Sequence, residues 1–151
     1  MVSKQTIKVR HNMEVAHRLS LLPGKCQQIH GHSMWVDLSL TGLVNGNGVL
    51  LGLDFATVKR HFRNYLDTFY DHRLLLNETD PLLNLLVKDV DGGYGANACT
   101  GDPTTENIAR WIGEWAMQTF EAVDLRHIKV EVAETHCNGA EWEAEVRYER
   151  T

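Results

Sequence analysis

The segment HGHSMWVDLSLT, residues 30–41, decides the fold because apolar and polar side chains alternate along most of its length. One face carries His32, Met34, Val36, Leu38 and Leu40, and the other carries Ser33, Trp35, Asp37, Ser39 and Thr41. Side chains of an extended backbone point to alternate faces, so this pattern predicts a β-strand with one buried face. Two imidazoles, those of His30 and His32, stand at the start of that buried face.

A similar alternation precedes this strand, over residues 7–17. Its buried face is predicted to hold Ile7, Val9, His11, Met13, Val15 and His17. The connection contains Leu21-Leu22-Pro23-Gly24-Lys25, which breaks the strand. We expect the two strands to be antiparallel neighbours, which places His17 near His30 and His32.

Two helices and two more strands are predicted in the rest of the chain. Asp54 is a candidate N-cap for a helix that runs to about Thr68, and Pro103 opens a second helix that Asp102 or a threonine could cap. The apolar stripes of these helices are Phe55, Val58, Phe62, Tyr65, Leu66 and Phe69, and Ile108, Trp111, Ile112, Trp115 and Phe120. Residues 91–102 are glycine-rich and are expected to form an exposed loop.

The end of the chain returns to strand alternation. The shared faces are Ile128, Val130, Val132 and Glu134, and Trp142, Ala144, Val146 and Tyr148. Asn138-Gly139 between them is a hairpin signal. The order β-β-α-α-β-β predicts a single α+β domain over residues 1–151, with two helices packed on one face of an antiparallel four-stranded sheet.

Composition narrows the classes of partner and compartment. The net charge of the 151 residues is −5 and no Lys/Arg-rich run occurs, which gives no support for nucleic acid as a partner. No apolar run approaches the ~18 residues of a membrane span, and the N-terminus lacks the apolar stretch of a secretion signal. Three widely spaced cysteines favour reduced thiols and a cytoplasmic location.

His17, His30 and His32 form the first candidate site. Each of them alone would most simply be a structural histidine with ordinary hydrogen bonds. Three on converging strand faces favour a zinc site instead. A set of three imidazoles leaves the fourth position of a tetrahedral ion open for water or substrate, which is typical of catalytic zinc.

Cys26 stands four residues ahead of His30 and has several interpretations. It could be a small core residue, although its place after Gly24-Lys25 argues for a loop. It could be a fourth zinc ligand that closes a structural site. It could instead be a thiolate beside the metal, acting as a base or a nucleophile. The residues alone leave the last two open.

Polar residues elsewhere complete the candidate set. Asp71-His72 is either a polar turn after a helix or a carboxylate that orients an imidazole for proton transfer. Glu134 ends an apolar strand face, which favours a partner with several donors, such as the edge of a heterocycle, over a surface ion pair. Thr104 and Thr105 are caps of the second helix, or groups that contact a ligand at its start.

Taken together, these motifs resemble the 6-pyruvoyltetrahydropterin synthase family. The resemblance rests, in order along nearly the whole chain, on Val15-Ala16-His17-Arg18-Leu19, Cys26-x-x-x-His30-Gly31-His32, Asp54-Phe55, Asp71-His72, Pro103-Thr104-Thr105-Glu106-Asn107 and Glu134-Thr135. The three-residue spacer after the cysteine resembles the bacterial 6-carboxytetrahydropterin synthase (QueD-type) branch.

The resemblance implies a tunnelling fold whose subunits join their sheets into a trimeric barrel, with two barrels stacked as a homohexamer. It implies a small-molecule substrate, 7,8-dihydroneopterin triphosphate, bound between subunits. By position, His17, His30 and His32 match zinc ligands and Cys26 matches the general base. Asp71 and His72 match a proton relay, Glu134 the anchor of the pterin ring, and Thr104 and Thr105 further pterin contacts.

The implied activity is that of a carbon–oxygen lyase on the route to queuosine and related 7-deazaguanines. Its products would be 6-carboxy-5,6,7,8-tetrahydropterin, triphosphate and acetaldehyde. Two alternatives remain: the pyruvoyl branch of the family, and a non-catalytic zinc or pterin-binding module in which Cys26 is a structural ligand.

Overall fold

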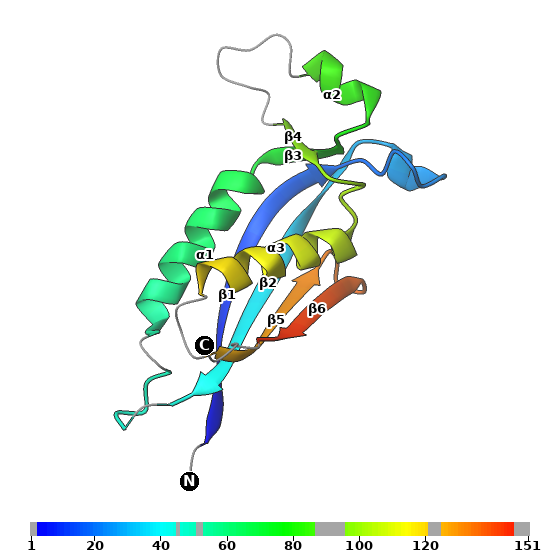
Figure 1. Ribbon diagram of the computed structural model, residues 1–151. Coiled ribbons are helices and arrows are strands. Elements are labelled where there is room, and N and C mark those ends of the chain that lie inside the picture. Colours follow the sequence, from blue (N-terminus) through cyan, green and yellow to red (C-terminus); the bar gives the residue numbers. More distant parts are fainter. Residues whose placement is uncertain (1–2, 45, 51–52, 87–95, 121–124, 147–151) are drawn as a thin grey trace, which may run out of the picture.

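The computed structural model describes residues 3–44, 46–50, 53–86, 96–120 and 125–146. In these residues one six-stranded sheet has the order β4-β3-β1-β2-β5-β6 (Figure 1). The strands are β1 (Lys4–His17), β2 (His30–Leu43), β3 (Arg73–Asn77), β4 (Ala96–Cys99), β5 (Leu125–Ala133) and β6 (Gly139–Glu145). The helices are η1 (Lys25–Gln27), α1 (Phe55–Phe69), α2 (Pro81–Leu86) and α3 (Thr105–Thr119).

The four long strands are antiparallel, as their alternation predicts. β1 and β2 pair along their whole length, from Lys4 opposite Leu43 to His17 opposite His30. β2 also pairs with β5, and β5 with β6. In the described residues the outer edge of β6 has no strand partner, and β1 has β2 as its one partner until Val15.

Two short strands make the sheet larger and mixed, which corrects the expected four-stranded antiparallel sheet. β3 pairs parallel with the end of β1, and β4 pairs parallel with β3. β3 is a run of leucines without alternation, which fits a buried helix as well as a strand. β4 places residues 96–99 in the sheet rather than in the exposed loop expected over residues 91–102; residues 91–95 lie outside the described residues.

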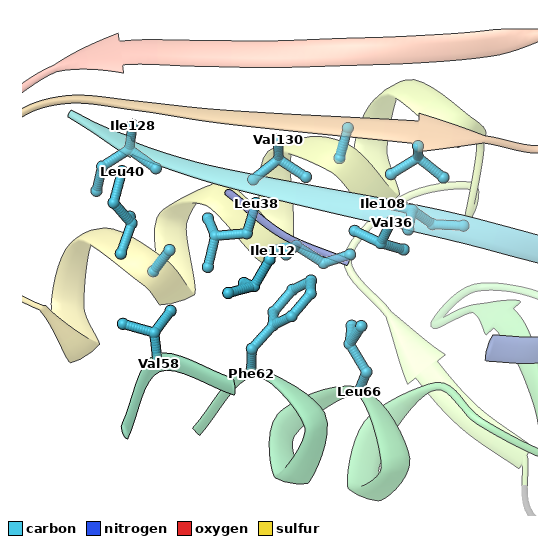
Figure 2. Packing of buried hydrophobic residues seen from close by; sticks show 14 of the residues in the cluster. Val36, Leu38, Leu40, Val58, Phe62, Leu66, Ile108, Ile112, Ile128 and Val130 are labelled. Carbon is cyan, nitrogen blue, oxygen red and sulfur yellow. The ribbon is translucent and has the colours of Figure 1, made fainter. Parts of the chain in front are cut away.

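Helices α1 and α3 cover one face of the sheet and enclose the core (Figures 1 and 2). Both begin close to the expected residues because a side chain caps each of them. Asp54 accepts a hydrogen bond from the Thr57 amide at 2.8 Å, and Thr104 accepts one from the Asn107 amide at 3.2 Å. Asp102, the alternative cap of α3, bonds elsewhere.

The core is formed by the faces that the sequence patterns predict. The buried side chains drawn in Figure 2 include Val36, Leu38 and Leu40 of β2, Val58, Phe62 and Leu66 of α1, Ile108 and Ile112 of α3, and Ile128 and Val130 of β5. The stripe of α1 is narrower than expected, since Phe55 and Phe69 at its two ends are about half exposed. None of the helices in the described residues is long and apolar enough to cross a membrane.

A glycine brings α3 close to β6. A Cβ built on Gly113 would lie 2.0 Å from Cε3 of Trp142, far inside van der Waals contact. The indole of Trp142 therefore occupies the space that a side chain on this turn of the helix would need. This contact fixes the distance between α3 and the edge of the sheet.

Candidate functional site

The three candidate histidines lie together at one end of the β1–β2 ladder. His17 is the last residue of β1 and His30 the first residue of β2, and the two are paired across the ladder. The ring centroids are 4.6 Å apart for His17 and His30, 5.2 Å for His17 and His32, and 5.0 Å for His30 and His32. Strand alternation and register thus bring three imidazoles to one place.

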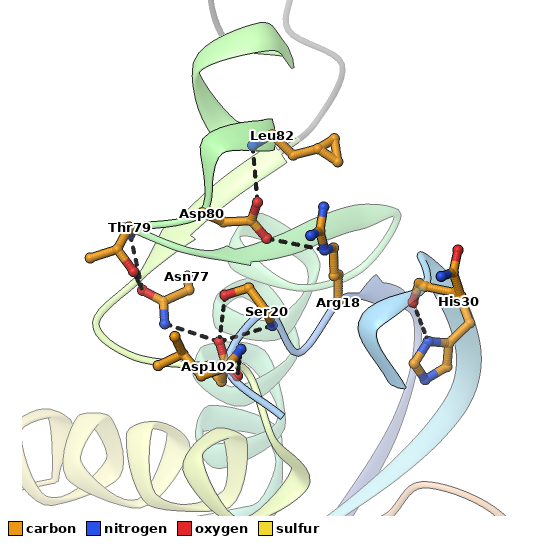
Figure 3. A network of polar contacts seen from close by, with 10 residues as sticks. Arg18, Ser20, His30, Asn77, Thr79, Asp80, Leu82 and Asp102 are labelled. Carbon is orange, nitrogen blue, oxygen red and sulfur yellow. Dashed lines mark hydrogen bonds and ion pairs between the residues drawn. The ribbon is translucent and has the colours of Figure 1, made fainter. Parts of the chain in front are cut away.

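Backbone carbonyl groups orient two of these rings. Nδ1 of His17 lies 2.8 Å from the carbonyl oxygen of Pro103, and Nδ1 of His30 lies 2.8 Å from that of Gln28, a contact drawn in Figure 3. A carbonyl oxygen can only accept a hydrogen bond, so each Nδ1 donates and each Nε2 of the neutral ring presents a lone pair. These two Nε2 atoms face each other at 3.1 Å.

The cluster fits a bound cation. Burial lowers the pKa of His17 below its ordinary 6.5, so this ring is neutral near pH 7. Nε2 of His32 is buried and has no hydrogen-bond partner among the described residues. One ligand nitrogen from each ring lies within 4.8 Å of the other two. A tetrahedral zinc site needs nitrogens about 3.4 Å apart, close to the spacing of His17 and His30.

Glu134 adds a carboxylate to the same place. It directly follows β5, and its Oε1 lies 3.7 Å from Nε2 of His17 and 3.6 Å from Nε2 of His32. The hydroxyl of Thr105, at the start of α3, donates a hydrogen bond of 2.9 Å to this same oxygen. A carboxylate beside inward-facing lone pairs makes the site electronegative, which a cation or a ligand with several N–H donors would offset.

Thr104 and Thr105 differ in what their hydroxyls do. Thr104 is the N-cap of α3, and its hydroxyl accepts a hydrogen bond from the Asn107 amide. Thr105 points its hydroxyl at Glu134. Of the two threonines, Thr105 therefore makes the direct side-chain link to the histidine cluster.

Cys26 lies in η1, on the loop between β1 and β2. Its side chain is half-buried, and its carbonyl oxygen accepts a hydrogen bond of 2.9 Å from the Leu19 amide. In the described residues, its sulfur does not belong to the group of candidate ligand atoms formed by His17, His30 and His32. This placement gives no support to the alternative in which Cys26 closes a structural metal site.

Asp71 and His72 form a hydrogen-bonded pair in the turn between α1 and β3. Oδ1 of Asp71 accepts a hydrogen bond of 2.7 Å from the Glu14 amide, and Oδ2 accepts one of 2.7 Å from Nδ1 of His72. Burial alone would raise the pKa of Asp71, but these hydrogen bonds outweigh it and hold the pKa below its ordinary value. His72 has a left-handed backbone, with φ at 56°, and its side chain is 79% exposed.

Within one described chain this pair does not bond to the histidine cluster. A hollow of about 440 Å³ is lined by both His32 and His72, together with Glu14, Val15, Ala16, Gly31, Ser33, Arg73 and Leu74. The structure therefore brings His17, His30, His32, Glu134 and Thr105 into direct contact, and leaves Asp71 and His72 beside an open hollow.

Sequence patterns alone miss the groups that orient this site. The carbonyl groups of Pro103 and Gln28 are backbone atoms, so no residue type marks them. The partners of Asp102 are missed as well: this residue stands before a proline and a threonine, where it resembles a helix cap. Its buried carboxylate instead binds Ser20, Leu21 and Asn77 (Figure 3).

Comparison with known proteins places the chain in one family. Residues 6–145 match the family described as 6-pyruvoyl tetrahydropterin synthase. A 6-carboxy-5,6,7,8-tetrahydropterin synthase of Rickettsia typhi is 28% identical over 104 residues, which cover 66% of this chain and 71% of that protein. A probable 6-carboxy-5,6,7,8-tetrahydropterin synthase of Halobacterium salinarum is 28% identical over 123 residues, covering 82% and 76%.

The fold comparison gives the same result. The structure of Plasmodium falciparum 6-pyruvoyl tetrahydropterin synthase superposes with a TM-score of 0.76 at 17% identity, covering 95% of this chain and 99% of that one. The α+β sheet with helices on one face is thus the tunnelling fold. The chain belongs to the 6-pyruvoyl tetrahydropterin synthase family, as its motifs indicate.

Proposed function

We propose that this chain is a zinc-dependent 6-carboxy-5,6,7,8-tetrahydropterin synthase. It would convert 7,8-dihydroneopterin triphosphate to 6-carboxytetrahydropterin, triphosphate and acetaldehyde, on the route to queuosine. The observation that carries the proposal is the convergence of three imidazoles with two Nε2 lone pairs facing each other at 3.1 Å. The 6-carboxytetrahydropterin synthases among its relatives favour this branch of the family.

His17, His30 and His32 would hold the zinc ion through their Nε2 atoms. When bound, zinc would supply Lewis-acid polarisation of the oxygen atoms on the substrate's side chain. The carbonyl groups of Pro103 and Gln28 keep two of the rings in the tautomer that binds metal.

The remaining candidate residues would bind the substrate and move protons. Glu134 would accept the N–H donors of the pterin ring, with Thr105 holding the carboxylate and Thr104 adding a contact at the helix start. Cys26 would take a carbon-bound proton as the general base. Asp71 holds Nδ1 of His72, so Nε2 of that ring is left to exchange a proton with the substrate.

We propose that the active enzyme is a homohexamer with sites between subunits. Asp71 and His72 make no bond to the histidine cluster of their own described chain, and they lie at an open hollow. A neighbouring subunit could place its own zinc site beside them. Edges of β1 and β6 that have no strand partner among the described residues are available for such an assembly. The three free thiols suit the cytoplasm.

The sharpest test of this function is Cys26→Ala. We expect the variant to keep about one zinc ion per chain, as wild type does, and to lose turnover of 7,8-dihydroneopterin triphosphate. Metal analysis and mass identification of the pterin product measure the two effects. A pyruvoyl product from wild type would assign the chain to the other branch. Loss of zinc in Cys26→Ala would support a structural metal site instead.

A further inference from the structure

The loop that carries Cys26 has little apolar packing to hold it in place. Of residues 18–29, Leu19 is the one that is buried. Leu21 is 73% exposed and Leu22 is 50% exposed. A surface loop with so few buried contacts is expected to open at a low free-energy cost unless polar contacts fix it.

Two carboxylates make polar contacts with this loop: Asp80 lies 3.5 Å from Nε of Arg18, and Asp102 makes the larger set of bonds (Figure 3). Its Oδ1 accepts hydrogen bonds from the Ser20 amide at 3.2 Å, the Ser20 hydroxyl at 3.0 Å and Nδ2 of Asn77 at 2.9 Å. Its Oδ2 accepts the Leu21 amide at 2.8 Å. Asp102 is 8% exposed, so these bonds form away from bulk water, where losing one is costly.

The charge on Asp102 is favoured by these donors. Burial alone would raise the pKa of the carboxyl group, but the hydrogen bonds from Asn77, Leu21 and Ser20 outweigh burial and hold the pKa below its ordinary value. Asn77 is itself fixed, because its Oδ1 accepts both the amide and the hydroxyl of Thr79. The Asp102 carboxylate therefore lies among donors that are already held in position.

Two short routes connect Asp102 to the candidate site. Along the first, Ser20 and Leu21 directly follow Leu19, whose amide donates to the carbonyl of Cys26 at 2.9 Å. Along the second, the next residue is Pro103, whose carbonyl orients the ring of His17 at 2.8 Å. One carboxylate thus fixes both the start of the Cys26 loop and the carbonyl that holds His17.

We propose that Asp102 is a positioning residue, which locks the Cys26 loop and the His17 ring into one arrangement for the reaction. The proposal rests on the proposed function for its catalytic meaning. It nevertheless makes a claim about loop order that is measurable without substrate.

The test is Asp102→Asn in the zinc-loaded protein. The amide keeps the shape of the side chain but puts an NH₂ group where the structure has an acceptor, so either Leu21 or the Ser20–Asn77 set loses its partner. We expect kcat to fall by about 10–100-fold with KM within about threefold of wild type, the range seen when outer-shell partners are lost.

Two measurements need no substrate. The amides of residues 19–21 should exchange with deuterium at least about tenfold faster in Asp102→Asn than in wild type. The rate at which iodoacetamide alkylates Cys26, followed by peptide mass spectrometry, should also change by more than about threefold. If wild type shows no turnover, the proposed function fails, while these two results still decide the positioning role.

Ser20→Ala and Phe62→Leu complete the experiment. Ser20→Ala removes one donor and keeps the charge, so it should show smaller changes in the same direction and serves if Asp102→Asn does not fold. Phe62→Leu destabilises the core away from the loop and should leave exchange of residues 19–21 and alkylation of Cys26 unchanged at temperatures where it is folded. The proposal would be overturned if Asp102→Asn and Ser20→Ala both showed the exchange and alkylation rates of wild type. It would also be overturned if Phe62→Leu changed these rates as much as the loop variants do.

Discussion

For each imidazole, the decisive question is which nitrogen carries the proton. His17 and His30 donate from Nδ1 to backbone carbonyl groups, so their Nε2 lone pairs face inward. Two lone pairs 3.1 Å apart repel unless a cation or a proton lies between them. Burial lowers the pKa of His17, so this ring does not supply the proton near neutral pH, whereas a metal ion would satisfy both lone pairs.

Removing one ring should therefore release the metal. We expect His30→Ala to bind zinc more than about 100-fold more weakly than wild type, since a tetrahedral site with three protein ligands loses one of them. His61→Ala is the matched control, because His61 is an exposed histidine on α1. Competition with a chromogenic chelator measures both affinities. Equal affinity in the two variants would contradict the assignment of His30 as a ligand.

Acid should destabilise the metal-free protein through His17. Its pKa in the folded state lies below its ordinary 6.5, so between these two values the unfolded chain binds more protons than the folded one. The free energy of unfolding then falls as the pH drops below 6.5. The carboxyl groups of Asp71 and Asp102 have lowered pKa values, so their contributions are lost only below the ordinary carboxyl value of 3.8.

Urea unfolding at pH 7.5 and pH 5.5, with a chelator present, measures this effect. Wild type should lose more stability between the two pH values than His17→Gln, whose side chain does not titrate. The same loss in both proteins would show that His17 does not control the acid response.

At the scale of elements, the contact between α3 and β6 overrides helix propensity. Alanine is normally favoured over glycine inside a helix by about 0.5–1 kcal/mol. At Gly113, however, an added Cβ would overlap the indole of Trp142. We expect Gly113→Ala to lower the free energy of unfolding by about 1–3 kcal/mol because the core is overpacked there.

A double-mutant cycle separates the two effects. In a Trp142→Ala background the overlap is gone, so the same Gly113→Ala change should be neutral or stabilising by up to about 1 kcal/mol. Urea denaturation of the four proteins gives the coupling between the sites. Equal destabilisation in both backgrounds would place the strain elsewhere.

Elements with a strong period were predictable, and those without one were not. The alternation in β1, β2 and β5 and the capped stripes of α1 and α3 predict these five elements closely. β3 is a short leucine run with no alternation, and β4 contains small and polar residues. Their strand conformation comes from pairing with β1 and with each other, which local pattern does not encode.

At the scale of the whole molecule, the proposal that sites are shared between subunits predicts complementation. Cys26→Ala and His72→Ala should each be inactive. Mixed assemblies of the two chains should regain about a quarter of the sites, because some sites then combine an intact Cys26 from one chain with an intact His72 from another. Activity after coexpression, compared with each variant alone, measures the recovery.

The matched control is a mixture of Cys26→Ala chains with His17→Ala chains. In the proposed assembly both residues belong to the half of the site that one chain supplies, so no mixed assembly should regain activity. Native mass spectrometry should show species of six times the 17.1 kDa chain in every mixture. Recovery in the control, or none with His72→Ala, would contradict shared sites.

As with the fold, one part of the candidate site could be predicted from the sequence and another part could not. His17, His30 and His32 could be grouped from the sequence because strand register is a short-range rule that puts them on converging faces. Glu134 could be named because it ends an apolar face. The roles of Pro103 and Asp102 could not be predicted, since they depend on tertiary contacts between segments up to 86 residues apart. That of Gln28 is local, but it comes from a backbone carbonyl that no residue type marks.

The pairing of His17 with His30 has a consequence for how such enzymes can diversify. Two candidate ligands are fixed by the ladder itself, so residues 22–27 of the connection form a cassette that can be replaced while Ser20, Leu21 and Gln28 keep their contacts. Insertions or exchanges in that cassette would move the candidate base while the metal stays in place. Grafting loops of different length onto this one hairpin should therefore yield a series of proteins with a constant metal affinity and a changing reaction outcome.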